Sequence, residues 1–129
     1  MSAPIRVLLA EDNVELSELL RALLDEQPDM QCLASVASLP ELRERADAAG
    51  DCVVVLDIEL RGESSLRQLS ALRQSMPAAR FVIFSGHNHP ELTRAARAGG
   101  AASYVVKSDG PEALLEAIRE ASPSSPLAH

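Results

Sequence analysis

The stretch Val53-Val54-Val55-Leu56-Asp57 decides the fold of this 129-residue chain. Four apolar residues in succession, three of them β-branched, are typical of a strand that is buried on both faces, as in a parallel sheet. A carboxylate, Asp57, follows the strand at once. Ligands of open α/β sheets bind in the crevice beyond the carboxyl ends of the strands, so Asp57 lies where chemistry is expected. A lone aspartate there would equally suit the start of a turn, and the rest of the chain has to distinguish the two.

Apolar runs elsewhere in the chain predict four further strands, separated by segments with helical spacing. The additional strands are expected at residues 5–10, 30–36, 81–84 and 104–106. Cap residues, early prolines and apolar periodicity predict five helices, which follow Asn13, Ser38, the loop 58–63, Pro90 and Gly110. This alternation predicts an α/β fold, a five-stranded parallel sheet flanked by five helices and joined by right-handed crossovers.

The expected order of the strands in the sheet is 2-1-3-4-5. The first, third and fourth strands are the most apolar and should therefore be central. The second strand alternates more loosely, with Cys32, Ala34 and Val36 on one face, and suits an edge. The fifth strand is short and is expected at the other edge.

The length and composition indicate one globular domain with an aliphatic core. Hydrophobic residues make up 47% of the chain, and aromatic residues only 2%. Residues 1–121 are expected to form the domain, and the Ser/Pro-rich residues 122–129 a disordered tail or the start of a linker. The helix at 91–98 has Leu92 as its one large apolar side chain and should be the most weakly packed.

The charge balance and the cysteines exclude several functional classes. With 12 Lys+Arg against 19 Asp+Glu, the formal net charge is −7, so direct nucleic-acid binding is disfavoured because phosphate contacts need a basic face. Cys32 and Cys52 have neither metal-ligand spacing nor the spacing of a redox pair, and are expected as buried thiols in a reducing compartment. No signal peptide or membrane span is visible, so a cytoplasmic domain without a membrane partner is expected.

Four of the five predicted strands end on polar groups: Glu11-Asp12, Asp57, Ser85 and Lys107. In a parallel sheet these groups converge at one edge. Three neighbouring carboxylates repel one another unless a cation joins them, and a set of oxygen ligands favours a hard cation such as Mg²⁺ (or Mn²⁺). Lys107 and the Ser85 hydroxyl would then be donors for a shared anion. Together these groups predict a site that accepts a phosphoryl group, with Asp57 as the nucleophile.

With these residues in view, the sequence resembles the receiver domain of two-component response regulators over about residues 5 to 121. The motifs that carry the resemblance are Val7-Leu8-Leu9-Ala10-Glu11-Asp12-Asn13, Val54-Val55-Leu56-Asp57-Ile58, Val82-Ile83-Phe84-Ser85-Gly86 and Tyr104-Val105-Val106-Lys107. The final segment, residues 107–115, is most similar to receivers attached to helix-turn-helix transcription regulators. The resemblance implies a flavodoxin-like receiver fold and a histidine kinase or phosphotransfer protein as phosphodonor.

The resemblance also implies a metal site around the phosphoacceptor. Asp57 would be the phosphoacceptor and a ligand of Mg²⁺. Asp12 would bind the ion directly, Glu11 would act through water, and the backbone carbonyl of Glu59 would be a further ligand.

A switch is implied at the next two strand ends. Ser85 would be the switch hydroxyl, Tyr104 the aromatic side chain whose rotamer follows it, and Lys107 the lysine that pairs with the phosphate. The weakly packed helix at 91–98 would carry the readout. Its Arg94 and Arg97, expected near glutamates of the last helix, are a candidate surface for a partner or for homodimerisation, and would equally suit an ordinary solvated surface.

Three positions depart from the pattern of the family. Arg61 stands where the family usually has proline, and Ser65 where it usually has glycine. Ser108 follows the lysine in place of the usual proline, whose cis bond shapes the loop. None of these departures removes a reacting group, but together they leave open a receiver-like adaptor that works without phosphorylation.

Other functions fit the residues less well. A dinucleotide binder is disfavoured because the first turn, residues 11–13, has charges and no glycines. A metal-dependent phosphohydrolase with an Asp nucleophile would usually carry an acid/base Asp where this chain has Glu59, and would need a substrate cap. His87 and His89 lack a third ligand for a metal ion, and His87 is expected to line the mouth of the site.

Overall fold

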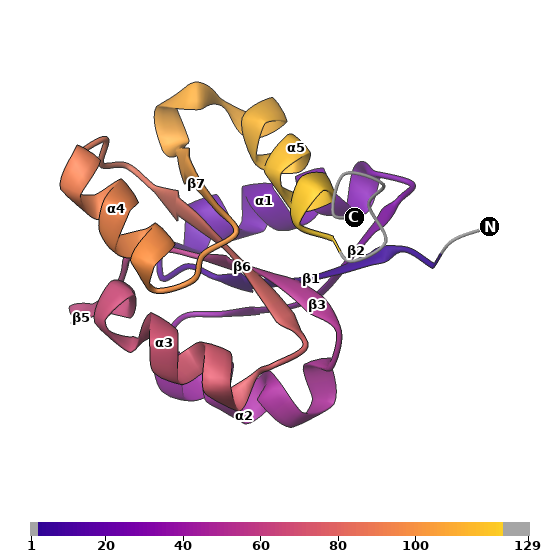
Figure 1. Ribbon diagram of the computed structural model, residues 1–129. Coiled ribbons are helices and arrows are strands. Elements are labelled where there is room, and N and C mark those ends of the chain that lie inside the picture. The colour runs from indigo at the N-terminus through magenta and orange to yellow at the C-terminus, as the bar shows by residue number, and fades with distance from the viewer. Residues whose placement is uncertain (1–2, 123–129) are drawn as a thin grey trace.

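The computed structural model describes residues 3–122, and its centre is a parallel sheet of five strands (Figure 1). The strands are β1 (Ile5–Ala10), β2 (Met30–Val36), β3 (Cys52–Leu56), β6 (Ala79–Ser85) and β7 (Ser103–Val106). Their order across the sheet is β2-β1-β3-β6-β7, and all four pairings are parallel. The predicted 2-1-3-4-5 order is therefore confirmed.

Five helices cover the two faces of the sheet, and their bounds are α1 (Val14–Glu26), α2 (Leu39–Ala49), α3 (Ser65–Ser75), α4 (Pro90–Ala98) and α5 (Pro111–Ala121). Helices α1 and α5 lie over one face, whereas α2, α3 and α4 lie toward the other (Figure 1). All five residues of β3 are buried, with Val54 and Leu56 in one core layer and Val53 and Val55 in the other. Side chains of this apolar run therefore pack alternately into the core layers on the two faces of the sheet. This is why apolar and polar residues do not alternate along it.

The edge strand β2 contains an irregularity that corrects one prediction. Its pairing with β1 shifts register between Val7 and Leu8, whose partners are Cys32 and Ala34. A bulged residue moves the following side chains to the opposite face. Cys32 therefore packs in the layer beneath α1 and α5, while Ala34 and Val36 pack in the other layer, so the prediction that the three share a face was wrong. Both cysteines are buried free thiols, as predicted.

The segment after Asp57, expected as a plain loop, contains a small antiparallel hairpin. Its strands are β4 (Glu59–Leu60) and β5 (Glu63–Ser64), with Leu60 opposite Glu63. The two turn residues, Arg61 and Gly62, have φ angles of 50° and 82°. Two positive φ angles define a type I′ turn, whose twist suits a two-residue hairpin. Proline, with φ fixed near −65°, cannot occupy the Arg61 position of this turn.

Helix α4 has the thin packing that the sequence predicted. Of its nine residues only Ala96 is buried, and its N-cap residue, His89, makes no side-chain capping bond. Helix α5 has five buried residues over eleven. Ser122 follows α5 as its C-cap and is buried; the predicted tail otherwise lies outside the described residues. No helix within residues 3–122 is long and apolar enough to cross a membrane.

Candidate functional site

The parallel topology brings the polar strand ends together at one edge of the sheet, as predicted. Glu11 and Asp12 follow β1, Asp57 follows β3, Ser85 ends β6 and Lys107 follows β7. Carboxylate oxygens of Glu11, Asp12 and Asp57 lie within 4.8 Å of one another. A pocket of about 450 Å³ opens over them, and its lining includes Asp12, Asp57, Glu59, His87 and Lys107.

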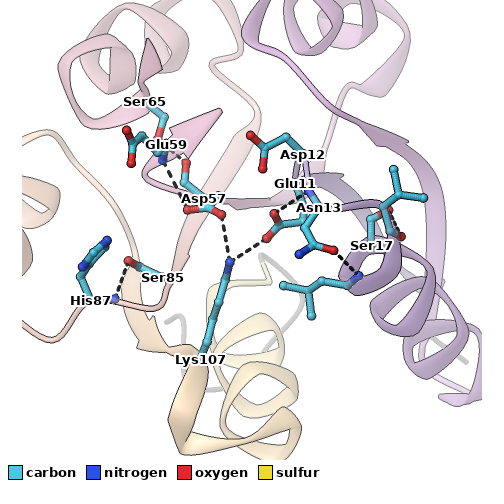
Figure 2. A network of polar contacts seen from close by, with 12 residues as sticks. Glu11, Asp12, Asn13, Ser17, Asp57, Glu59, Ser65, Ser85, His87 and Lys107 are labelled. Atoms are coloured by element: carbon cyan, nitrogen blue, oxygen red, sulfur yellow. Dashed lines mark hydrogen bonds and ion pairs between the residues drawn. The ribbon is translucent and has the colours of Figure 1, made fainter. Parts of the chain in front are cut away.

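The ammonium group of Lys107 lies between Glu11 and Asp57 (Figure 2). Its Nζ donates to Oε1 of Glu11 and to Oδ2 of Asp57, at 2.9 Å in each case. The sequence suggested a lysine free to bind an anion; instead its ammonium group joins two carboxylates that would otherwise repel each other. The Lys107 side chain is 26% exposed and Glu11 only 5%, so this cation lies partly shielded from water.

Burial and hydrogen bonding change the pKa values of both Glu11 and Lys107. Desolvation raises the pKa of Glu11 above its usual value, against the opposing effect of Lys107 and of the Asn13 N–H, which donates to Oε2 at 3.0 Å. Desolvation alone would lower the pKa of Lys107, but its hydrogen bonds to Glu11 and Asp57 outweigh this and raise it. The lysine is therefore held in its charged form.

Asp12 is the exposed member of the cluster and contacts the hairpin. Its Oδ2 accepts a hydrogen bond of 2.8 Å from the backbone N–H of Arg61. A proline at position 61 has no N–H and cannot make this bond. The departure at Arg61 thus supplies a donor to a candidate metal ligand, a contact that no sequence motif signals because it joins residues 49 positions apart.

Asp57 is held through its backbone and its side chain. Ser65, which is fully buried, donates from Oγ to the Asp57 backbone carbonyl, and the Glu59 N–H lies 3.3 Å from Oδ1. Glu59 lines the same pocket as Asp57. The departure at Ser65 therefore adds a hydrogen bond to the backbone of the candidate phosphoacceptor.

Ser85 and Tyr104 are joined through the backbone of a third residue, His87. The Oγ of Ser85, which is fully buried, accepts from the His87 N–H at 3.0 Å. The Tyr104 hydroxyl donates to the His87 carbonyl at 2.8 Å. The hydroxyl hydrogen of Ser85 is therefore not used in its bond to His87, so the group retains a donor.

The two loop histidines do not form a metal site. The rings of His87 and His89 are stacked with centroids 6.0 Å apart, and the only group of potential metal ligands in residues 3–122 is Glu11, Asp12 and Asp57. His87 lines the pocket, as predicted. The Lys107–Ser108 peptide bond is not cis, and Lys107 nevertheless reaches both carboxylates from a short 3₁₀ turn, Lys107–Asp109.

The acidic cluster fits a hard divalent cation. Its donors are all oxygens, and they lie within 4.8 Å of one another, slightly beyond the separation of about 4.2 Å between opposite ligands of an ion with metal–oxygen distances of about 2.1 Å. Asp12 and Asp57 both line the open pocket, whereas Glu11 is buried behind them. An ion at this position would share Asp57 and Glu11 with Lys107.

Comparisons with known proteins agree with this geometry. The sequence profile of the response regulator receiver domain matches residues 7–119. The nitrate/nitrite response regulator proteins NarL and NarP of Escherichia coli (strain K12) are 30% and 31% identical over 118 and 121 residues, in each case covering 92% of this chain and 55% of the relative. The chain thus spans about half the length of these relatives.

A solved structure supports the same assignment. The two-component response regulator of the LuxR family from Aurantimonas sp. SI85-9A1 superposes with a TM-score of 0.84 at 28% identity, covering 98% of this chain and 94% of that chain. From the profile match over most of its length and from the acidic edge of its parallel sheet, the chain belongs to the family of response regulator receiver domains.

Proposed function

We propose that this receiver domain accepts a phosphoryl group on Asp57 from a phosphohistidine of a histidine kinase or phosphotransfer protein. One observation carries the assignment: Asp57 lines the open pocket, and its Oδ2 lies 2.9 Å from the Lys107 ammonium. Of the three clustered carboxylates, Glu11 is buried and Asp12 is bonded to Arg61. Asp57 is the one that combines pocket access with a lysine able to follow an incoming phosphate.

The transfer conserves atoms and charge in a simple way. A carboxylate oxygen of Asp57 attacks phosphorus and forms a P–O bond as the P–N bond to the histidine breaks. The leaving nitrogen keeps the electron pair and takes a proton from water, and the product is an acyl phosphate. Lys107 exchanges its charge-assisted contact with the Asp57 carboxylate for one with the phosphate oxygens, which carry more negative charge.

The same proposal includes Mg²⁺ (or Mn²⁺) as cofactor. Asp12, Asp57 and the backbone carbonyl of Glu59 would hold the ion directly, and Glu11 would act through a water molecule. When bound, the ion supplies positive charge to the equatorial oxygens of the phosphoryl group. Arg61 then has a positioning role, because its N–H orients the exposed Asp12 carboxylate.

Ser85 and Tyr104 would convert the phosphorylation into a change of surface. A phosphate on Asp57 offers oxygens to the free donor of Ser85, whose movement would loosen its bond to the His87 N–H. Tyr104 is tied to the carbonyl of the same residue, so one rearrangement of the His87 backbone reaches both side chains. Helix α4 begins three residues after His87 and buries only Ala96, so little apolar contact holds it in place when the His87 backbone moves.

The readout is proposed to be contact with another protein in the cytoplasm, including a second copy of this chain. The match covers only 55% of NarL, which supports an output by a separate module in such relatives, and the net charge of −7 disfavours direct contact of this domain with nucleic acid. The domain would take part in its own phosphotransfer and dephosphorylation without acting as an enzyme on other substrates.

Intact mass spectrometry after incubation with acetyl phosphate and Mg²⁺ tests the assignment. One phosphoryl adduct is expected on the wild type and none on Asp57→Asn. Asp29→Asn is the matched control, because it makes the same change at an aspartate outside the pocket. An adduct that persists in Asp57→Asn would assign the phosphate elsewhere, and no adduct on the wild type would favour an adaptor that works without phosphorylation.

A further inference from the structure

A second polar pocket lies at the opposite end of the sheet from the acidic site. Its volume is about 310 Å³, at the small end of the range for ligand pockets, which is about 300–1,000 Å³. It lies among the C-terminal turns of α3, the start of β6 and the segment that leads from α4 into β7. Arg80 and Ser85 are five residues apart on β6, so about 16 Å separates the two sites along the strand.

The lining of this pocket has the opposite charge to the rest of the protein. It contains two arginines, Arg73 and Arg80, and the neutral donors Ser70 and Gln74. No carboxylate occurs among the described residues that line it, although the chain has 19 acidic residues against 12 basic ones. A pocket with positive charge and neutral donors favours an oxyanion.

Neither arginine is used within the described part of the chain. Arg73 and Arg80 make no ion pair and no side-chain hydrogen bond with any residue from 3 to 122. Among the described arginines, side-chain bonds are made by Arg119, to Asp29 at 2.8 Å and to Gln27, and by Arg43, to Gln68. Arg73 and Arg80 are both exposed, so their donors are available to a ligand.

The guanidinium group of Arg73 lies against the glycine turn that follows α4. Gly100 has a φ of 96°, and a Cβ atom at this position would collide with the guanidinium of Arg73. The absence of a side chain at Gly100 therefore lets the Arg73 head group lie against the turn after α4. This places a planar, fivefold donor at the wall of the pocket.

We propose that this basic pocket, defined by Ser70, Arg73, Gln74, Arg80 and Gly100, binds the phosphate group of a small molecule or free phosphate. Phosphate is favoured over a single carboxylate because two guanidinium groups match a dianion with several acceptor oxygens. A bound dianion would connect α3, β6 and the end of α4, and would stabilise the folded state by mass action. The site needs neither Mg²⁺ nor Asp57, so it stands independently of the phosphotransfer proposed above.

A backbone NMR titration of the whole chain tests the proposal, with inorganic phosphate added in EDTA and sodium chloride adjusted to constant ionic strength. Saturable shifts are expected at residues 70–80 and 99–102. Each of Arg73→Gln and Arg80→Gln should weaken binding about fivefold, the scale of one partly exposed charge contact. Arg94→Gln, an exposed arginine of α4 outside the pocket, is the control with the same charge change and should leave the affinity unchanged.

Parallel titrations distinguish the sources of the phosphate and the competing anions. Tighter binding of glycerol phosphate than of inorganic phosphate would identify an organic phosphomonoester as ligand, and the reverse would identify the free ion. Arg73→Lys, which keeps the charge but loses the planar fork, should bind with intermediate affinity. The proposal is overturned if the shifts do not saturate, if acetate produces the same shifts, or if Arg73→Gln binds phosphate as well as the wild type.

Discussion

Replacing Lys107 by methionine tests the electrostatic design of the acidic pocket. The lysine joins Glu11 and Asp57 at 2.9 Å each, and without it their oxygens remain within 4.8 Å of each other. At an effective dielectric constant of about 20, two unit charges at that separation repel by about 3.5 kcal/mol. Uptake of a proton by Glu11, whose pKa burial already raises, relieves part of this repulsion.

The expected loss of stability in metal-free buffer is about 2 kcal/mol. This lies between about 0–1 kcal/mol for an exposed ion pair and about 3–5 kcal/mol for breaking a buried one, because Lys107 is 26% and Asp57 14% exposed. For a domain of this size it corresponds to a decrease in melting temperature of about 8 °C. Thermal unfolding in EDTA measures it.

Magnesium should reverse most of this loss. In the wild type, the ammonium group of Lys107 and a divalent cation compete for the same oxygens, so Mg²⁺ should stabilise Lys107→Met more than the wild type, by at least about 1 kcal/mol. Arg119→Met is the matched control: it also breaks an ion pair but lies outside the pocket, and it should show the wild-type response to Mg²⁺. An Mg²⁺ shift in Lys107→Met that is equal to or smaller than that of the wild type would refute the shared-cation reasoning.

Three further predictions follow from contacts elsewhere in the fold. In urea unfolding, Arg61→Pro should lower the free energy of unfolding by about 1–3 kcal/mol, because proline can neither adopt a φ of 50° nor donate a hydrogen bond to Asp12. Arg61→Gly should be neutral or slightly stabilising, and equal stabilities of the two variants would contradict the turn geometry. Hydrogen bonding to Arg119 lowers the pKa of Asp29, so the stability that this pair contributes is present above about pH 4 and is lost as the pH falls through the folded-state pKa. Asp29→Asn should remove this acid-sensitive contribution, which solvent exposure limits to about 1 kcal/mol or less. If the free energy of unfolding of Asp29→Asn decreases below pH 4 as it does in the wild type, the pair does not contribute. Burial raises the pKa of Cys52 to about 11, so this thiol should resist thiol reagents near pH 8 in the native protein and react only on unfolding. Rapid labelling of Cys52 in the native protein would show that β3 opens readily.

The sequence by itself determined the sheet and the residues that gather at its edge. The β-branched apolar run at 53–56 predicted a strand buried on both faces, and the polar residues at the strand ends had to converge once the sheet was parallel. These features are local: periodicity, caps and strand ends can be read within about ten residues. The order of the strands followed because the most apolar runs must be central.

Contacts between distant segments were decided only by the tertiary structure. The bulge in β2 reversed the faces of Ala34 and Val36, because register depends on the neighbouring strand and not on the alternation within β2 itself. The bond from Arg61 to Asp12 joins two loops 49 residues apart. It arises from a turn conformation that the Arg-Gly pair does not announce, since arginine seldom adopts a positive φ.

The state of Lys107 shows the same division most clearly. Its residue type and its place after the last strand were sufficient to put a cation near Asp57. Whether that cation is free or bonded depends on distances among three chain segments, and the structure gives 2.9 Å to two carboxylates. The local sequence sets which charged residues reach the edge of the sheet. Their interaction energies depend on the distances between the charges and on their burial, and only the folded chain defines these.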